Sequence, residues 1–318
     1  MPALSSQETS QVLNSARQLP INGPVERVED FVSRVLTLNR FQQAEYFPHP
    51  DPESLLAKAV GILTAARQKI LEDDCDVPNF VVYRDELGFS QIAGLNTYLE
   101  LKDIGASHER LRGRLTQHGQ IREALRRLEK GHHLEALASA IMNAGCNYGE
   151  ATRGSGDQGI DAIGWKELMM IDSAFSNDLV SITDVLPGEK VFLFASSKAV
   201  IGSKRGQPKL LNPAHIRELV GGWVIQRTST GIWRTAGIRM LSPVQMILVT
   251  TYRLSTEAKS DCRDLGIQVW GIPELVYLVC RWAPETIFDA VNGYTFSTPA
   301  FRSWWKERDQ RRVVPTGL

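Results

Sequence analysis

An aspartate and a lysine stand beside two apolar stretches that are short enough to be buried strands. Asp161 follows a glycine-bracketed turn over residues 156–159, and Lys198 follows the apolar run 191–195 and two serines. Because side chains alternate along strands, neighbouring strands can bring Asp161 and Lys198 to one edge of a sheet. A carboxylate there can hold a divalent metal ion, and a lysine beside it can orient a water molecule. Phosphodiester hydrolysis uses that pair of roles.

Helices and strands are predicted to alternate around this pair. A helical pattern over 134–142 ends at Gly145, and glycine is common just past the end of a helix. Further helices are predicted over 216–224, 255–265 and 272–279, and further strands over 246–251 and 267–270. This alternation predicts an α/β domain with a mixed, mostly buried sheet.

The order of the short motifs in this region is similar to that of one known family. A helix carrying Glu135 and ending near a glycine comes first, then the Asp-Gln-Gly-Ile-Asp turn at 157–161, then the strand before Lys198. The pieces 216–221, 248–258 and 265–275 follow. Together they resemble an Mrr-like restriction endonuclease domain, which belongs to the PD-(D/E)xK nuclease superfamily. The resemblance covers about half of the chain.

The resemblance implies a fold, a cofactor and a set of site residues. The fold would be a restriction-endonuclease-like mixed β-sheet flanked by helices over residues 129–285. Asp161 would be the main metal ligand, Lys198 the catalytic lysine, and Glu135 the helix carboxylate that completes the site. The cofactor would be Mg²⁺, with Mn²⁺ as a substitute, and the activity that of a DNA endonuclease in bacterial restriction or antiphage defence.

The chain departs from the family pattern at Ser196. The family has Glu or Gln two residues before the lysine, and serine is a poor replacement for a metal ligand. In one interpretation Glu218, on the following helix, supplies the missing carboxylate to the metal. In the other, the site has decayed and the domain is a subunit that binds DNA or assembles a defence complex. Glu135 and Glu218 also fit a simpler interpretation as solvated residues on helix surfaces.

The regions on either side of this domain show no chemistry of their own. Residues 1–20 are polar and predicted to be flexible, and residues 21–128 form a mainly helical domain of unassigned role, with one short strand over 80–83. Residues 286–318 form an aromatic and basic tail. Its tryptophans and cations would suit nucleic acid, but large tryptophans more often pack a terminal segment onto a core.

The composition limits the partners. Lys plus Arg equals Asp plus Glu at 36 each, so overall positive charge does not argue for nucleic acid. A local basic loop just after Lys198 is the best candidate for contacting a phosphate backbone, through Lys204, Arg205 and Lys209. DNA is therefore the expected partner. Cutting both strands of a duplex usually takes two active sites, which favours a homodimer, and a partner protein from a defence system is a further expectation.

The cysteines and the N-terminus indicate a cytoplasmic protein. None of the four cysteines lies in a CxxC pair, which excludes zinc-finger spacing and a dense disulfide framework. The first residues lack the charged start and apolar stretch of a signal peptide. No run of eighteen apolar residues occurs, so no membrane association is expected.

Overall fold

The chain folds into two compact units. The computed structural model describes residues 6–40, 52–72, 76–101, 106–128, 131–146, 148–152, 160–168, 189–197, 210–228 and 243–310. The units are Met1–His118 and Gly119–Leu318. The boundary predicted between residues 128 and 129 therefore lies inside the second unit, after its first helix, α6 (His118–Arg126).

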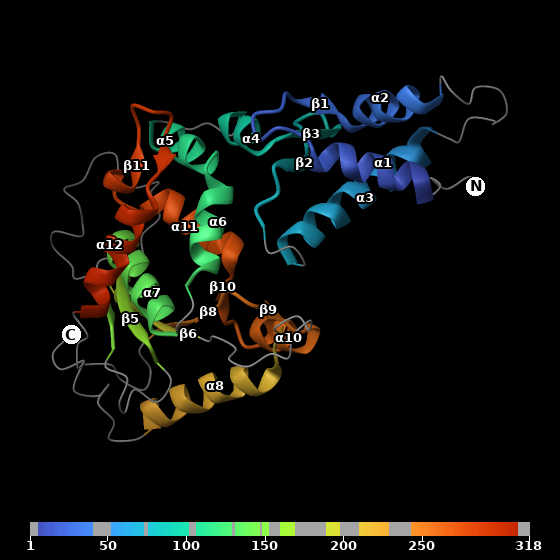
Figure 1. Ribbon diagram of the computed structural model, residues 1–318. Coiled ribbons are helices and arrows are strands. Elements are labelled where there is room, and N and C mark those ends of the chain that lie inside the picture. Colours follow the sequence, from blue (N-terminus) through green and yellow to red (C-terminus); the bar gives the residue numbers. More distant parts are fainter. Residues whose placement is uncertain are drawn as a thin grey trace, which may run out of the picture. The chain divides into compact units, whose positions relative to one another are not determined.

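The first unit combines helices with a small antiparallel sheet (Figure 1). Its helices are α1 (Ser6–Arg17), α2 (Val28–Arg40), α3 (Pro52–Glu72), α4 (Leu95–Leu101) and α5 (Ala106–Leu115). Its strands are β1 (Glu26–Arg27), β2 (Phe80–Arg84) and β3 (Ser90–Gly94), in the order β1-β3-β2. Apolar side chains of the first three helices meet Phe80 and Ile92 of the sheet in one core, and Phe31, Leu63 and Phe80 are at most 1% exposed.

Two features of the first unit differ from the expectations. The N-terminal segment, predicted to be flexible, contains helix α1, whose Val12 and Ala16 are 0% exposed in the core shared with α2 and α3. Only one strand was expected, but β1 and β3 pair with each other and β3 with β2. Helix α1 and strand β1 depend on contacts with segments far apart in sequence, which local patterns do not contain, whereas β2 and β3 form a local hairpin.

The second unit contains a five-stranded mixed sheet. Its strands are β4 (Tyr148–Ala151), β5 (Ala162–Leu168), β6 (Glu189–Ser197), β8 (Val244–Val249) and β10 (Gln268–Trp270), in the order β10-β8-β6-β5-β4. The pairs β4–β5 and β5–β6 are antiparallel, whereas β6–β8 and β8–β10 are parallel. The predicted α/β domain with a mixed sheet is confirmed. A separate two-stranded parallel pair joins β7 (Leu210–Leu211) to β9 (Arg253–Leu254).

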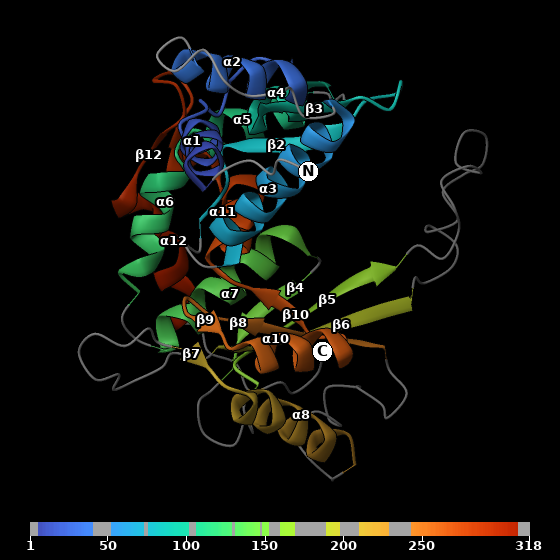
Figure 2. The ribbon, with the colours of Figure 1, turned by 90° about the vertical axis from the view of Figure 1, so that its right-hand side faces the viewer.

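Helices cover both faces of this sheet (Figure 2). Helix α7 (Gly131–Gly145) packs on β4, β5 and β6. Helices α8 (Pro213–Thr228) and α10 (Thr256–Asp264) share a core with Met246 and Leu248 of β8. Ser255 caps the start of helix α10, since its hydroxyl accepts a hydrogen bond from the backbone N–H of Ala258. Helix α11 (Ile272–Trp282) follows β10. No helix in the described ranges is long and apolar enough to cross a membrane.

The predicted C-terminal tail is, as far as residue 310, a folded part of the second unit. It forms the 3₁₀ turn η3 (Glu285–Ile287), the hairpin β11 (Phe288–Asp289) and β12 (Thr295–Phe296), and helix α12 (Thr298–Gln310). Helix α12 packs on α7, where the Trp305 ring is 4.8 Å from that of His133. Trp305 is only 2% exposed, so the packing interpretation of the tryptophans holds for this residue.

Two glycines let α7 lie close to the sheet. A Cβ on Gly149 of β4 would overlap the backbone nitrogen of Asn143 and lie 2.6 Å from the Met142 Cβ. A Cβ on Gly164 of β5 would lie 2.7 Å from the Tyr148 carbonyl oxygen. The closeness of α7 to β4 therefore depends on the absence of a side chain at Gly149, and Gly164 leaves room for the backbone of β4 and for Met142.

We expect Gly149→Ala to lower the free energy of unfolding of the second unit by about 1–3 kcal/mol, because the added methyl group overpacks the contact with α7. All seven tryptophans lie in this unit, so urea unfolding followed by tryptophan fluorescence reports on it selectively. Gly221→Ala in α8 is the matched control, since nothing lies within 4 Å of its added Cβ. The free energy of unfolding of that variant should rise by about 0.5–1 kcal/mol, because alanine loses less backbone entropy on folding than glycine does. Equal effects at both positions would contradict the close-packing argument.

Candidate functional site

Asp161 lies one residue before β5 and extends the pairing of β5 with β6. Its N–H donates to the Ala195 carbonyl over 2.8 Å, and its own carbonyl accepts from the Thr152 N–H over 3.0 Å. Because Ala162 pairs with Ala195, this arrangement sets Asp161 opposite Ser196. The start of β5 and the end of β6 therefore meet at one edge of the sheet, as the sequence predicts.

The Asp161 carboxylate is held by two donors from β6. Its Oδ2 accepts the backbone N–H of Ser197 over 2.6 Å and the hydroxyl of Ser196 over 3.3 Å. Ser196 is 0% exposed and Ser197 8% exposed, while Asp161 is partly buried. Hydrogen bonds to an ionised carboxylate are stronger than those between neutral groups, so they fix the orientation of this side chain.

The same edge carries the ends of the parallel strands. Ser196 pairs with Leu248 and Ser197 with Val249, so β6 and β8 end side by side. Thr250 follows β8, is 0% exposed, and donates its N–H to the Trp270 carbonyl at the end of β10. In open α/β sheets, ligands bind at the carboxyl ends of the strands. The edge therefore has the topology of a ligand-binding edge, with Asp161 on it.

Several predicted site residues lie outside the part of the chain that the structure describes. Lys198 is the residue directly after Ser197 and is among them. The predicted DNA-contacting residues Lys204, Arg205 and Lys209 are also outside, as is the turn over 156–159. Their roles stay predictions.

Glu135 is a partly buried residue of α7. Two residues separate the end of α7 from the start of β4, and the two elements pack together, so the helix runs back along the strand. Met142 lies over Gly149 and Gly164. Glu135 is two turns earlier in the helix, and β4 runs toward the pair of Ala151 with Ala162. We therefore expect Glu135 near the end of the sheet that carries Asp161.

Glu218 is exposed on α8, between two residues of the core, Ile216 and Leu219. By strand alternation, Ser196 is on the same face of the sheet as Met246 and Leu248, which is the face that α8 and α10 cover. Glu218 therefore belongs to a helix on the Ser196 face, whereas Glu135 belongs to the helix on the opposite face.

This edge offers a metal ion one carboxylate whose orientation is fixed by hydrogen bonds, that of Asp161. Across the described ranges, no three His, Cys, Asp or Glu side chains gather into a group that could hold an ion. Mg²⁺ does not need such a cage, because it usually keeps several waters and binds through one or two carboxylates and substrate phosphates. Asp161 fits that mode as a single hard oxygen ligand, and the shared ligand set of Asp161, Glu135 and Glu218 stays a prediction.

In the sequence, Ser196 stands out only as a missing ligand, and Ser197 carries no sign of a role at the site. The structure places the Ser196 hydroxyl and the Ser197 N–H on the same carboxylate oxygen. The second donor is a backbone group, so the type of residue 197 carries no signal for it. Only the pairing register of β5 and β6 could have identified it.

Comparison with known proteins gives one distant similarity. No protein-family profile matches the chain, and no curated protein matches it. Among solved structures, the chain is similar to the MspJI restriction endonuclease in complex with a 27-mer oligonucleotide, with a TM-score of 0.37 and 17% sequence identity. The match covers 74% of this chain and 59% of that one, so this chain spans less than two thirds of the length of that protein.

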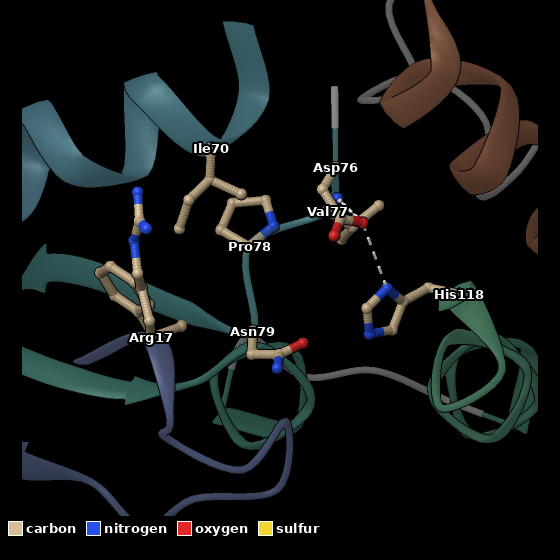
Figure 3. Close-up of a pocket in the computed structure, with 8 residues that line it drawn as sticks. Arg17, Ile70, Asp76, Val77, Pro78, Asn79 and His118 are labelled. Atoms are coloured by element: carbon tan, nitrogen blue, oxygen red, sulfur yellow. Dashed lines mark hydrogen bonds and ion pairs between the residues drawn. The ribbon is translucent and has the colours of Figure 1, made fainter. Parts of the chain in front are cut away.

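The first unit contains a cavity of about 180 Å³ (Figure 3). Four polar and four apolar residues line it: Arg17, Asp76, Asn79, His118, Ile70, Val77, Pro78 and Phe80. The His118 ring nitrogen Nδ1 is 3.6 Å from the Asp76 Oδ1, which also accepts the Val77 N–H over 2.9 Å. These contacts order the segment that leads into β2, so we assign the cavity a packing role.

Replacing Asp161 should destabilise the second unit, because the Ser197 N–H and the buried Ser196 hydroxyl lose their acceptor. We expect Asp161→Ala to lower the free energy of unfolding by about 1–3 kcal/mol. Asp161→Asn keeps an oxygen acceptor and should cost clearly less. Urea unfolding followed by tryptophan fluorescence measures both. An Asp161→Ala protein as stable as wild type would mean that these hydrogen bonds do not form in solution.

Proposed function

We propose that the second unit is a Mg²⁺-dependent DNA endonuclease. The observation that carries the proposal is the Asp161 carboxylate, oriented by two donors at the carboxyl edge of the parallel strands, where β6 ends one residue before Lys198. The resemblance of the motif order to Mrr-like restriction endonuclease domains supports the same activity. That resemblance also motivates a setting in bacterial restriction or antiphage defence, in the cytoplasm.

Each proposed residue has a distinct task. Asp161 would hold Mg²⁺ through a carboxylate oxygen, with Glu135 and Glu218 as further ligands. The ion, when bound, supplies a Lewis acid that polarises the phosphate and lowers the pKa of a bound water. Lys198 would orient the attacking water and balance the negative charge that builds up on the phosphate.

DNA would be held by positive charge close to this edge. The loop residues Lys204, Arg205 and Lys209 follow Lys198 within a short stretch of sequence, so a phosphate backbone bound by them could reach the site. Two copies of the chain would place one site on each strand of a duplex, which is why a homodimer is part of the proposal. A defence-system partner protein is a further part of it.

A second function is favoured by one specific observation. The position where the family has a metal-binding Glu or Gln here carries a fully buried serine, which donates to Asp161. A site with one carboxylate fewer is weaker for metal, and a domain that has lost catalysis can keep the fold. In that case the chain would be a non-catalytic subunit that binds DNA or assembles a defence complex.

Plasmid cleavage tests the proposed activity. Wild-type protein should nick or linearise plasmid DNA with Mg²⁺ or Mn²⁺ and lose all cleavage in EDTA. Asp161→Asn and Lys198→Ala should each reduce the rate by about 100-fold or more, as removal of a group that stabilises the transition state does. Asp264→Asn is the matched control, because Asp264 is an exposed carboxylate on α10, and it should cleave like wild type.

The two functions predict different results in this assay. Cleavage by Asp161→Asn at the wild-type rate would overturn the endonuclease assignment. DNA binding without cleavage under any of these metal conditions, with binding unchanged by Lys198→Ala, would establish the non-catalytic function instead.

The Mg²⁺ dependence of cleavage tests whether Glu135 and Glu218 bind the ion. If Glu218 supplies the missing ligand, Glu218→Gln should raise the Mg²⁺ concentration for half-maximal cleavage by about tenfold or more, and Glu135→Gln should do the same if it completes the site. Glu123→Gln on α6 is the control, because Glu123 is exposed and forms a surface ion pair with Arg127, four residues later in the chain. If the Mg²⁺ dependence is unchanged, the substituted glutamate is not a metal ligand and is a solvated residue on the surface of its helix.

A further inference from the structure

Ser196 is a buried polar residue in an apolar part of the sheet. It is 0% exposed, and strand alternation sets it on the same face as Phe194, while its pairing partner is Leu248. Burying a hydroxyl without a hydrogen bond costs free energy. The acceptor that relieves this cost is the Oδ2 atom of Asp161, 3.3 Å from the Ser196 hydroxyl oxygen. The residue at this position therefore acts as a donor to the carboxylate.

Both donors from β6 use the same carboxylate oxygen. The Ser197 N–H reaches Oδ2 over 2.6 Å, in addition to the Ser196 hydroxyl. Hydrogen bonds to an ionised carboxylate are stronger than those between neutral groups, so the two donors together set the orientation of the Asp161 side chain.

We propose that Ser196 is a positioning residue for the metal site, and that its hydroxyl holds the Asp161 carboxylate in the orientation in which it would bind the ion. This inference rests on the proposed endonuclease function and deepens it. One oriented carboxylate suits Mg²⁺, which takes few protein ligands and keeps bound waters. Ser196, where the chain departs from the family pattern, would then supply a hydrogen bond to the metal ligand Asp161 in place of a second carboxylate.

The two serine-to-alanine changes available in this domain make a matched pair. Ser139 of α7 is also 0% exposed, and its hydroxyl has no hydrogen-bond partner among the described residues. Ser139→Ala therefore removes the same buried atom as Ser196→Ala without removing a donor to Asp161. Ser196→Thr keeps the hydroxyl and serves as the conservative variant.

The experiment measures Mn²⁺ binding to the full chain without DNA by electron paramagnetic resonance, together with urea unfolding in EDTA. Ser196→Ala should weaken Mn²⁺ binding about 10- to 100-fold, which is the usual effect of losing a hydrogen-bond partner of a metal ligand. Ser196→Thr should stay within about threefold of wild type, since the hydroxyl is kept. Ser139→Ala should bind Mn²⁺ like wild type, and all variants should remain folded.

Distinct results overturn the inference and the function. Mn²⁺ binding by Ser196→Ala equal to wild type overturns the positioning role, as does an equal loss in Ser139→Ala. A folded Ser196→Thr protein that binds Mn²⁺ as weakly as Ser196→Ala also overturns the positioning role. In each of these cases, wild-type cleavage that depends on Asp161 leaves the endonuclease function standing. Wild-type protein that neither binds Mn²⁺ nor cleaves DNA refutes the function itself.

Discussion

The register between β5 and β6 is the constraint on which the candidate site depends. Asp161 and Ser196 are 35 positions apart, and they face each other because Ala162 pairs with Ala195. A slip of one residue would turn every side chain of one strand to the other face of the sheet. The apolar residues of β6 alternate between the α7 face and the α8 face, so burial on both sides opposes such a slip. The packing of the core therefore sets the geometry of the carboxylate.

Strand β4 is the outer strand of the sheet, beside β5, and the C-terminal helix α12 packs against it. Helix α12 packs on α7 and also contacts β4. Arg308 of α12 donates to Glu150 of β4 over 2.9 Å, and both side chains are less than a fifth exposed. Removing one partner of this pair would leave a partly buried charge without its counter-ion, which costs free energy. The terminal segment thus covers an edge strand and stabilises the hairpin that leads to Asp161.

The elements with strong local patterns agree with their predictions. Helix α7 ends at Gly145, α10 begins at its Ser255 cap, and the apolar runs at 191–195 and 246–251 correspond to β6 and β8. The weaker elements were not predicted, among them β1, β3, β4 and helix α1. A two-residue strand or a mostly polar helix has little periodicity of its own, and its stability comes from tertiary contacts.

The sequence by itself determined the α/β order of the second unit, with a carboxylate before one strand and a lysine after another, and the chemistry of that pair is a prediction from it. Only the tertiary structure decided what Ser196 does. Its residue type indicated a lost ligand, whereas its burial and its 3.3 Å contact with Asp161 make it a donor. The second donor to Asp161 is the backbone N–H of Ser197, a group that every residue but proline has. Such roles are set by which strands pair and in which register, and that depends on the packing of the whole sheet.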